Sequence, residues 1–497
     1  MPTANNISTD SHPFLDGRPK RLFINGSWVA AVSGETFDCV NPSTGATIAQ
    51  VARGGPADID IAVAAARAAF NGDWSRWKPF DRQALLLNVA TAIDQRFDEL
   101  CRLESIDMGA PLARTSLFRR WMQQAFRFYA SQAVNITSQI YGNSVPGDFF
   151  SYSLKTPLGV TGAIIPWNGP MITQLWSICP TLATGCTLVL KPAEEAPLSS
   201  LLLAEIMTEA GVPAGVINVV PGPGPTTGAA LAAHPGVDKI TFTGSTATGR
   251  KIIEASAVNM KRVAVELGGK SPNIVFADAN LEAAATGAAM ACFNNTGQIC
   301  YAGTRLFVER SIYDRFVERV ADVGRSLRIG DALDLSSQLG PLTSQAQLDR
   351  VTRYFAVARA EGVKVLSGGE RLGGALAAGY FVAPTVLVNV HNDMRIAQEE
   401  IFGPVLSAIP FDTEDEVLSL ANDTGYGLGG GVWTRDLGRM HRVTRAIQCG
   451  IAWANCYGVT EPGVPMAGTK QSGYGVKGGP WHVDEYLRAK TVWMNTA

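Results

Sequence analysis

The sequence predicts an α/β protein in which short buried strands alternate with helices. Runs rich in Val, Ile and Thr recur through residues 161–267, and stretches with helical composition separate them. The same alternation resumes after Gly268 and Gly269. Strands that are joined through helices pair in parallel and have helices on both faces of the sheet. Glycine accounts for 51 of the 497 residues, which suits a fold with many tight turns.

In chain order, the first elements follow a polar leader. RLFINGSWV (21–29) predicts two short strands around an Asn25-Gly26 turn. Residues 56–106 are rich in Ala, Leu and charged residues with helical periodicity. The next expected strands are 161–166, 186–192, 215–222, 238–245 and 262–267, and the helices between them are 198–210, 226–233 and 246–257.

A second α/β unit follows the Gly-Gly pair. Its expected strands are 271–278, 304–310, 384–390, 404–411, 429–434 and 450–456, with helices over about 280–294 and from about 312. Two segments fit neither unit: 135–156 predicts a β-hairpin, and 486–495 predicts a terminal strand. Exposed strands of this kind usually need another chain to cover their edge.

Composition excludes several classes of protein. The chain is 46% hydrophobic and 17% charged, which is typical of a globular protein. Its net charge of −2 gives no sign of a surface for nucleic acid or anionic membrane. The polar leader lacks the apolar region of a secretory signal, and no apolar run is long enough to span a membrane.

Cysteine and histidine usage argues against a metal site. The eight Cys include no C-x-x-C, and the five His show no H-E-x-x-H spacing. We therefore expect no metal, and we expect reduced thiols in a cytoplasmic protein.

Two segments carry candidate reactive groups. GQICYAG (297–303) places Cys300 among small residues after a predicted helix, where a lone cysteine could also be a small buried hydrophobe. VELGGKSPN (265–273) places Glu266 at a strand end before a Gly-Gly turn. Such a carboxylate is either a solvated turn residue or an acid/base group, and strand ends in α/β folds are where reacting groups gather.

Three further strand ends suit ligand binding. FTGSTATGR (242–250) is a G-x-T-x-x-G turn before a helix, where glycine and the helix N-terminus could hold a phosphate. Asn168 in IPWNGP could be a turn residue or a donor to a developing oxyanion. Lys191 and Glu194 in KPAEEAP could be solvated or could bind ribose hydroxyls.

Taken together, these segments resemble the aldehyde dehydrogenase superfamily over roughly residues 20–497. The ordered set is IPWN (165–168), KPAE (191–194), G-x-G (222–224), FTGSTATG (242–249), VELGGK-x-P (265–272), GQIC (297–300), EEIFGPV (399–405) and K-x-SG (470–473). The resemblance implies an oxidoreductase that is NAD(P)-dependent, hydrolytic and not CoA-acylating.

The resemblance also implies three structural parts and self-association as a homodimer or homotetramer. They are a Rossmann-like NAD-binding domain (1–133 and 157–266), an α/β catalytic domain (267–466) and a small β oligomerisation arm (134–156 and 484–497).

The implied catalytic residues are Cys300, Glu266 and Asn168. The Cys300 thiolate attacks the aldehyde, and the Asn168 amide with the Cys300 backbone N–H holds the oxyanion. After hydride transfer, Glu266 activates the water that hydrolyses the thioester to the acid. Intact Glu266 argues against a CoA-acylating relative. Two different functions stay open at this point: a thiol esterase that uses the same Cys300, and a binding protein that has lost catalysis.

For the cofactor, the resemblance implies ribose, pyrophosphate and nicotinamide contacts. The implied residues are Ile164, Pro166, Trp167, Lys191, Glu194, Gly224, Gly244, Ser245, Leu267, Glu400 and Phe402. Glu194 would bind a 2′-hydroxyl and repel a 2′-phosphate, which favours NAD over NADP.

The substrate tunnel departs from the pattern of many relatives, which carry an aromatic residue at the place of Gly169. The implied tunnel residues are Gly169, Thr173, Trp176, Asn294, Tyr301, Thr460 and Met466. They predict a wider, more polar tunnel for a bulky or aromatic aldehyde, unless flanking loops refill the space. By resemblance, Ser177 and Lys477 stand where several relatives have a Lys and a Glu that are proposed to relay protons, so the relay from Glu266 must differ or run through water.

Overall fold

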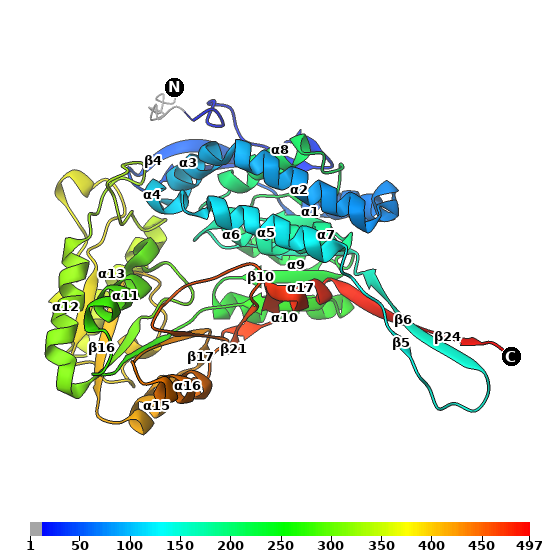
Figure 1. The fold of residues 1–497 in the computed structure, drawn as a ribbon. Helices are drawn as coiled ribbons and strands as arrows, with labels where there is room; N and C mark the ends of the chain where they lie inside the picture. The colour runs from blue at the N-terminus through cyan, green and yellow to red at the C-terminus, as the bar shows by residue number, and fades with distance from the viewer. Residues whose placement is uncertain (1–11) are drawn as a thin grey trace.

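The structure, a computed structural model that describes residues 12–497, contains two large sheets with helices on both faces (Figure 1). Residues 1–11, part of the leader for which no secretory signal is expected, lie outside the described residues. The first sheet has eight strands in the order β2-β1-β9-β8-β7-β10-β11-β22. They are β1 (Leu22–Ile24), β2 (Ser27–Val29), β7 (Val160–Ile164), β8 (Thr187–Lys191), β9 (Ile217–Val219), β10 (Lys239–Thr243), β11 (Arg262–Glu266) and β22 (Gly473–Tyr474).

The centre of this sheet is parallel and buried on both sides. The five central strands, β9, β8, β7, β10 and β11, pair in parallel. Strands β1, β2 and β22 join the two edges in the antiparallel direction. Along β8, Leu188 and Leu190 pack into one core and Val189 into the other. Helices α2 (Pro79–Gln95), α3 (Phe97–Met108), α5 (Phe118–Ala133), α7 (Leu175–Thr184) and α8 (Leu198–Glu209) cover one face, and α1 (Pro56–Asn71), α9 (Ala229–Ala233) and α10 (Thr246–Ser256) the other.

The second sheet has seven strands in the order β14-β15-β16-β13-β12-β18-β19. They are β12 (Pro272–Val275), β13 (Arg305–Glu309), β14 (Lys364–Ser367), β15 (Thr385–Val388), β16 (Val405–Phe411), β18 (Gly429–Trp433) and β19 (Ile451–Ala454). Leu306 and Val308 of β13 face the core under α11 (Leu281–Phe293) and α12 (Tyr313–Ser326), and Phe307 faces the opposite core. Helices α13 (Gln345–Ala360), α15 (Glu414–Asn422) and α16 (Leu437–Ala446) cover that opposite face.

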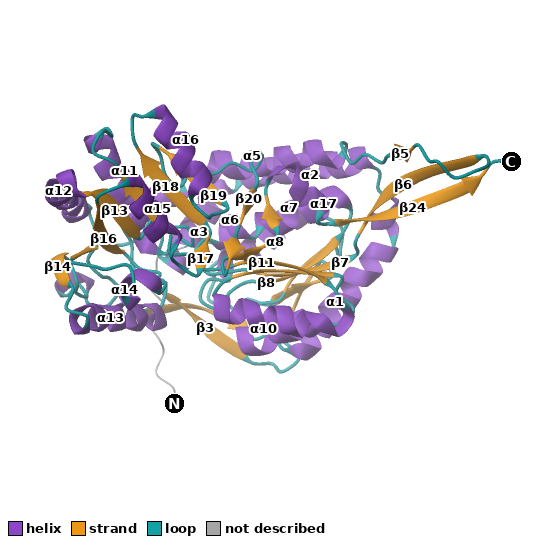
Figure 2. Cartoon of the chain, turned by 90° about the horizontal axis from the view of Figure 1, so that it is seen from below, coloured by secondary structure: helices purple, strands orange, loops and turns teal. Residues whose placement is uncertain are grey.

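A β-arm projects from the body of the molecule (Figures 1 and 2). It consists of β5 (Ile140–Tyr141), β6 (Phe149–Pro157) and β24 (Leu487–Asn495), in the order β24-β6-β5. The two long strands pair antiparallel from Leu487 opposite Pro157 to Asn495 opposite Phe149. The C-terminal strand is thereby held against a hairpin that lies more than three hundred positions earlier in the chain.

The predicted α/β class is confirmed, and strands lie at the predicted positions in both units. The predicted helix 226–233 is partly wrong, because its first turn, Gly224–Gly228, is a π-helix and only α9 is α-helical. The β3 (Thr36–Asn41) and β4 (Ala46–Ala52) hairpin and helix α5 were not predicted from the sequence. Strand β22 comes from 467–483, a segment that the predicted domain division leaves unassigned.

Two properties of the described residues bear on the predicted class of protein. None of the helices within 12–497 is long and apolar enough to cross a membrane. All eight cysteines are free thiols, of which Cys300, Cys449 and Cys456 are partly exposed.

Candidate active site

A cavity of about 340 Å³ lies where strands of the first sheet end and the second unit begins. Thr243 and Glu266, the last residues of β10 and β11, line it from the first sheet. The 299–301 loop and the 400–402 loop line it from the second unit. The carboxyl ends of parallel strands are the usual position of ligand sites in α/β folds. The cavity size also suits a small-molecule site.

The loop before Cys300 has an unusual backbone. Asn295 (φ 53°), Thr296 (φ 55°) and Gly297 (φ 72°) lie consecutively in the left-handed region. A non-glycine residue there is uncommon, so surrounding contacts must impose this conformation. One such contact involves Gly269, where a Cβ atom would lie 2.4 Å from the Cys300 carbonyl oxygen. The Gly-Gly turn after β11 therefore allows the Cys300 loop to approach the strand that ends at Glu266.

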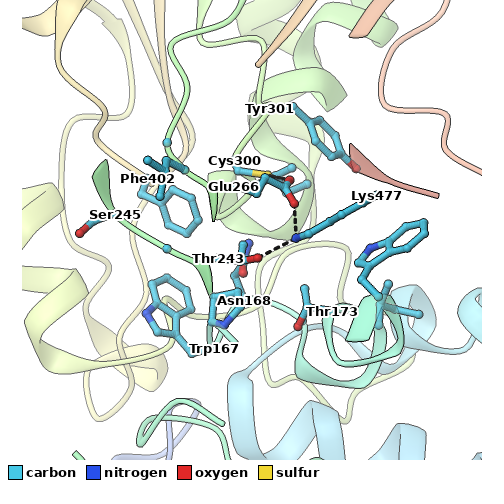
Figure 3. Close-up of a pocket in the computed structure, with 18 of the residues that line it drawn as sticks. Trp167, Asn168, Thr173, Thr243, Ser245, Glu266, Cys300, Tyr301, Phe402 and Lys477 are labelled. Carbon is cyan, nitrogen blue, oxygen red and sulfur yellow. Dashed lines mark hydrogen bonds and ion pairs between the residues drawn. The ribbon is translucent and has the colours of Figure 1, made fainter. Parts of the chain in front are cut away.

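Glu266 bridges Cys300 and Lys477 (Figure 3). The Cys300 thiol donates to Glu266 Oε1 at 3.6 Å, and Lys477 forms an ion pair with Glu266 Oε2. Lys477 Nζ also donates to Thr243 Oγ1 at 2.6 Å. Because Thr243 and Glu266 are paired residues of adjacent parallel strands, one ammonium group can contact both side chains.

The electrostatics of this cluster favour a protonated thiol in the resting protein. Burial raises the pKa of Cys300 well above its ordinary value, and the Glu266 carboxylate raises it further. The Lys477 ammonium acts in the opposite direction. Glu266 Oε1 is consequently placed to accept the thiol proton, while Lys477 compensates the charge of the carboxylate.

Asn168 is held beside Cys300 by the same loop. The side-chain Nδ2 of Asn168 donates to the Gln298 backbone carbonyl at 2.9 Å. The backbone carbonyl of Asn168 accepts from Asn295 Nδ2 at 3.1 Å. An amide nitrogen carries two N–H groups, so one remains available. Within residues 12–497 the Cys300 backbone N–H has no acceptor. These two donors are suited to an oxygen bound next to the sulfur.

One group of predicted cofactor residues forms an internally paired set. Lys191 Nζ donates to Glu194 Oε2 at 2.9 Å, and the Gly224 N–H donates to Glu194 Oε1 at 3.1 Å. Burial raises the pKa of Glu194, but the Lys191 ammonium and hydrogen bonds more than offset it, so the pKa lies below its ordinary value. Ser245 Oγ caps α10 by accepting from the Thr248 N–H at 3.2 Å.

The second group of predicted cofactor residues lines the cavity, whereas Lys191, Glu194 and Gly224 lie outside its lining. Glu400 Oε1 accepts from the Gly269 N–H at 3.0 Å. Phe402 has φ 64° and packs edge-on against Trp167 at 5.3 Å between ring centroids. Gln347 and Arg350 of α13 donate to backbone carbonyls of this loop and fix its shape. Pro166, Leu267 and Gly244 also line the cavity, whereas Ile164 is buried behind it.

The structure brings all but one of the predicted tunnel residues to the cavity. The lining ones are Gly169, Thr173, Trp176, Tyr301, Thr460 and Met466. Asn294 lies outside the lining, because it ends α11 and its Oδ1 accepts from Arg114 Nε at 3.0 Å. Ser177 makes no hydrogen bond to Glu266: its hydroxyl is 3.1 Å from Thr241 Oγ1.

Comparison with known proteins decides the family. A family model described as the aldehyde dehydrogenase family matches residues 28–492. The chain belongs to the aldehyde dehydrogenase family. The predicted NAD(P)-linked oxidoreductase class is thereby confirmed, together with the fold class.

Individual aldehyde dehydrogenases align over nearly their whole length. The mitochondrial aldehyde dehydrogenase of Homo sapiens is 44% identical over 95% of this chain and 91% of its own. The DhaS protein of Bacillus subtilis (strain 168) is 45% identical over 97% of each chain. The structure of the Bacillus cereus aldehyde dehydrogenase in its NAD+ complex has a TM-score of 0.95 at 41% identity, with full coverage of both chains.

Several residues of this aldehyde dehydrogenase cavity were not predicted from the sequence. Arg114 of α4 (Leu112–Thr115), Phe118 and Trp121 line the side opposite the cofactor residues. Their only common sequence feature is a helical spacing, which also describes an ordinary surface helix. Lys477 departs from relatives in the sequence, but its contact with Glu266 was not predicted. Among the described residues there is no His, Cys, Asp and Glu cluster suited to a metal.

Proposed function

We propose that the chain oxidises an aldehyde to its carboxylic acid with NAD, through a covalent intermediate on Cys300. One observation carries the proposal: the Cys300 thiol, the Glu266 carboxylate and the Asn168 amide meet in one cavity with seven of the eleven residues expected to bind the cofactor. An unreactive buried cysteine would not require two oxyanion donors and an adjacent carboxylate.

The first half-reaction forms the acyl-enzyme. Glu266 accepts the thiol proton from Cys300, and the Cys300 sulfur forms a bond to the aldehyde carbon. The carbonyl π electrons move to oxygen, where the Asn168 Nδ2–H and the Cys300 N–H stabilise the negative charge. NAD, when bound, accepts the hydride that leaves the same carbon. The carbon–oxygen double bond forms again and leaves a thioester on Cys300.

The second half-reaction releases the acid. Glu266 first releases the thiol proton to solvent. It then accepts a proton from water, and the water oxygen forms a bond to the thioester carbon. The carbon–sulfur bond then breaks, which regenerates the Cys300 thiolate. Lys477 forms an ion pair with Glu266 Oε2. Glu266 must therefore accept protons on Oε1, or this ion pair must break. Ser177 and Lys477 both stand where several relatives have proposed relay residues. Lys477 contacts Glu266, whereas the Ser177 hydroxyl contacts Thr241.

The donor chemistry fits a dinucleotide. Carboxylates such as Glu194 and Glu400 accept hydrogen bonds from ribose hydroxyls, and the α10 N-terminus at Ser245 presents N–H groups to a pyrophosphate. The Glu194 carboxylate would repel a 2′-phosphate, so we propose NAD rather than NADP. The NAD+ complex of the Bacillus cereus relative supports this choice.

A bulky substrate is supported by the space beside Gly169. A Cβ atom built on Gly169 would meet nothing within 4 Å, so the loops have not refilled this position. Phe118 and Trp121 nevertheless make the far wall more aromatic than the sequence suggested. The cavity thus favours an aldehyde with a planar body.

We also propose that the β-arm packs on a second copy of the chain, in a cytoplasmic homodimer or homotetramer. Exposed apolar side chains along the arm support this proposal: Ile140, Tyr141, Phe150, Leu154, Trp493 and Met494. A solution mass of a single 52.8 kDa chain would contradict it.

The decisive experiment follows NADH absorbance with purified protein and a panel of short aliphatic to substituted aromatic aldehydes. We expect NADH with NAD and bulky aldehydes, and its loss in Cys300→Ala. Cys456→Ala is a matched control, because Cys456 is another partly exposed thiol outside the cavity lining. If no aldehyde reduces either cofactor while ester hydrolysis persists, the dehydrogenase proposal is wrong.

A further inference from the structure

Arg114 is an unpaired cation on the substrate side of the cavity. Its side chain is half-buried and lines the cavity together with Phe118, Trp121 and Thr173. Within residues 12–497, no carboxylate forms an ion pair with its guanidinium group. A partly desolvated cation without a compensating anion is unfavourable, so such a group usually has a ligand.

The guanidinium is fixed in place through one nitrogen only. Arg114 Nε donates to Asn294 Oδ1 at 3.0 Å, and the guanidinium carbon lies 4.9 Å from the centre of the Phe118 ring. Neither terminal nitrogen has an acceptor among the described residues. The N–H groups that form a planar fork are therefore free, while the side chain behind them is oriented.

Glu104, the nearby carboxylate, does not form an ion pair with Arg114. The Glu104 carboxylate is buried, and burial raises its pKa to about 7, with Arg114 among the weaker opposing influences. Its oxygens accept from the Met171 N–H at 3.2 and 3.3 Å rather than from Arg114. The other cations in the lining are already engaged: Lys477 binds Glu266, and Arg350 binds the backbone of the 400–402 loop.

A second polar group on the same wall also lacks a partner. The Thr173 hydroxyl is buried and makes no hydrogen bond within the described chain. Trp176 packs edge-on against Trp121 at 5.1 Å and forms an apolar wall. The substrate side thus offers an anion-binding fork and aromatic surfaces, with an unpaired hydroxyl buried behind them, whereas a simple aliphatic aldehyde would leave the fork unsatisfied.

We propose that the physiological aldehyde carries a carboxylate at the end remote from its carbonyl group, and that Arg114 binds this carboxylate. The inference rests on the proposed function, because it assumes that the carbonyl carbon lies at Cys300. A planar carboxylate can accept two parallel hydrogen bonds from the free fork. Asn294 is then a positioning residue that holds Arg114, which explains why it lies behind the lining.

The test compares pairs of substrates in which an uncharged group replaces the carboxylate. The kcat/KM for 4-carboxybenzaldehyde is measured against methyl 4-formylbenzoate, and for succinic semialdehyde against butanal. We expect the acid of each pair to be preferred. Arg114→Met should lower kcat/KM for the acids by about 100-fold and leave the neutral aldehydes within about threefold. Arg114→Lys should recover part of the loss, because it keeps the charge without the fork.

Arg120→Met is the matched control. Arg120 lies on α5, is exposed and does not line the cavity, so its loss changes net charge equally without changing the site. A wild-type enzyme that oxidises neutral aldehydes with no preference for the acids would overturn this inference and leave the proposed function intact. Equal losses on acids and neutral aldehydes in Arg114→Met would also overturn it. Failure of every aldehyde to yield NADH would instead contradict the proposed function.

Discussion

The two sides of the active-site cavity differ in how completely their polar groups are paired. On the side of the predicted cofactor residues, Glu400 is bound by the Gly269 amide, and Glu194, outside the lining, is bound by Lys191 and by the Gly224 amide. On the substrate side, the Arg114 fork and the Thr173 hydroxyl have no partner within the described chain.

This difference separates a preformed half from a selective half. Groups that are already hydrogen-bonded keep their geometry before any ligand arrives, which lowers the cost of ordering a common cofactor. Unpaired polar groups remain costly until a complementary ligand binds, so they reject substrates that lack its polar atoms. Cys300, Glu266 and Lys477 lie where the two sides of the cavity meet. We expect substitutions there to have the largest effects on turnover.

Glu266→Gln should have the largest effect, since it removes the base where the two sides meet. We expect steady-state turnover to fall by about 100- to 10,000-fold. A first burst of NADH should persist, because the hydride leaves before water attacks. Rapid-mixing measurements of burst size and steady rate check this, with the exposed Glu254→Gln on α10 as control. A variant that loses burst and steady rate together would place the main role of Glu266 at the thiol step.

Glu194→Ala should act on the cofactor side alone. We expect KM for NAD to rise by about 10- to 100-fold, because one charged acceptor is lost and the buried Lys191 ammonium is left unpaired. Use of NADP should improve relative to NAD, and KM for the aldehyde should stay unchanged. The paired variant is Thr173→Val, which should change aldehyde KM but not NAD KM. Equal changes in both constants for either variant would remove the distinction between the two sides.

Lys477→Met should produce the smallest but most diagnostic effect, in the pH dependence of Cys300 alkylation. Lys477 lowers the pKa of Cys300 and Glu266 raises it. Loss of the cation should thus move the alkylation profile to higher pH, and Glu266→Gln should move it to lower pH. Iodoacetamide rates across pH check both shifts, with the exposed Lys251→Met as control. Shifts of the same sign would contradict the bridging arrangement.

Local sequence was sufficient for most strands of the two large sheets and for the groups at their ends. Short β-branched runs predict buried strands wherever they occur, because their burial on both faces requires apolar residues without a polar side. Glu266 and Asn168 follow such runs directly, and Cys300 lies in a short motif of small residues. The approach of Glu266 and Asn168 to one cavity follows from the parallel strands, whose carboxyl ends share one edge, whereas Cys300 reaches it on a loop of the second unit.

The sequence by itself therefore determined the α/β class and the family resemblance, and it named Cys300, Glu266 and Asn168 as the candidate reactive residues. Only the tertiary structure decided that Lys477 pairs with Glu266, that Asn294 supports Arg114 and that Arg114 lines the cavity. Each of these contacts joins segments that are distant in the chain: Arg114 and Asn294 are 180 residues apart. Such contacts depend on how helices and loops pack around the sheets, and no local pattern of residues encodes the direction in which a side chain will finally point.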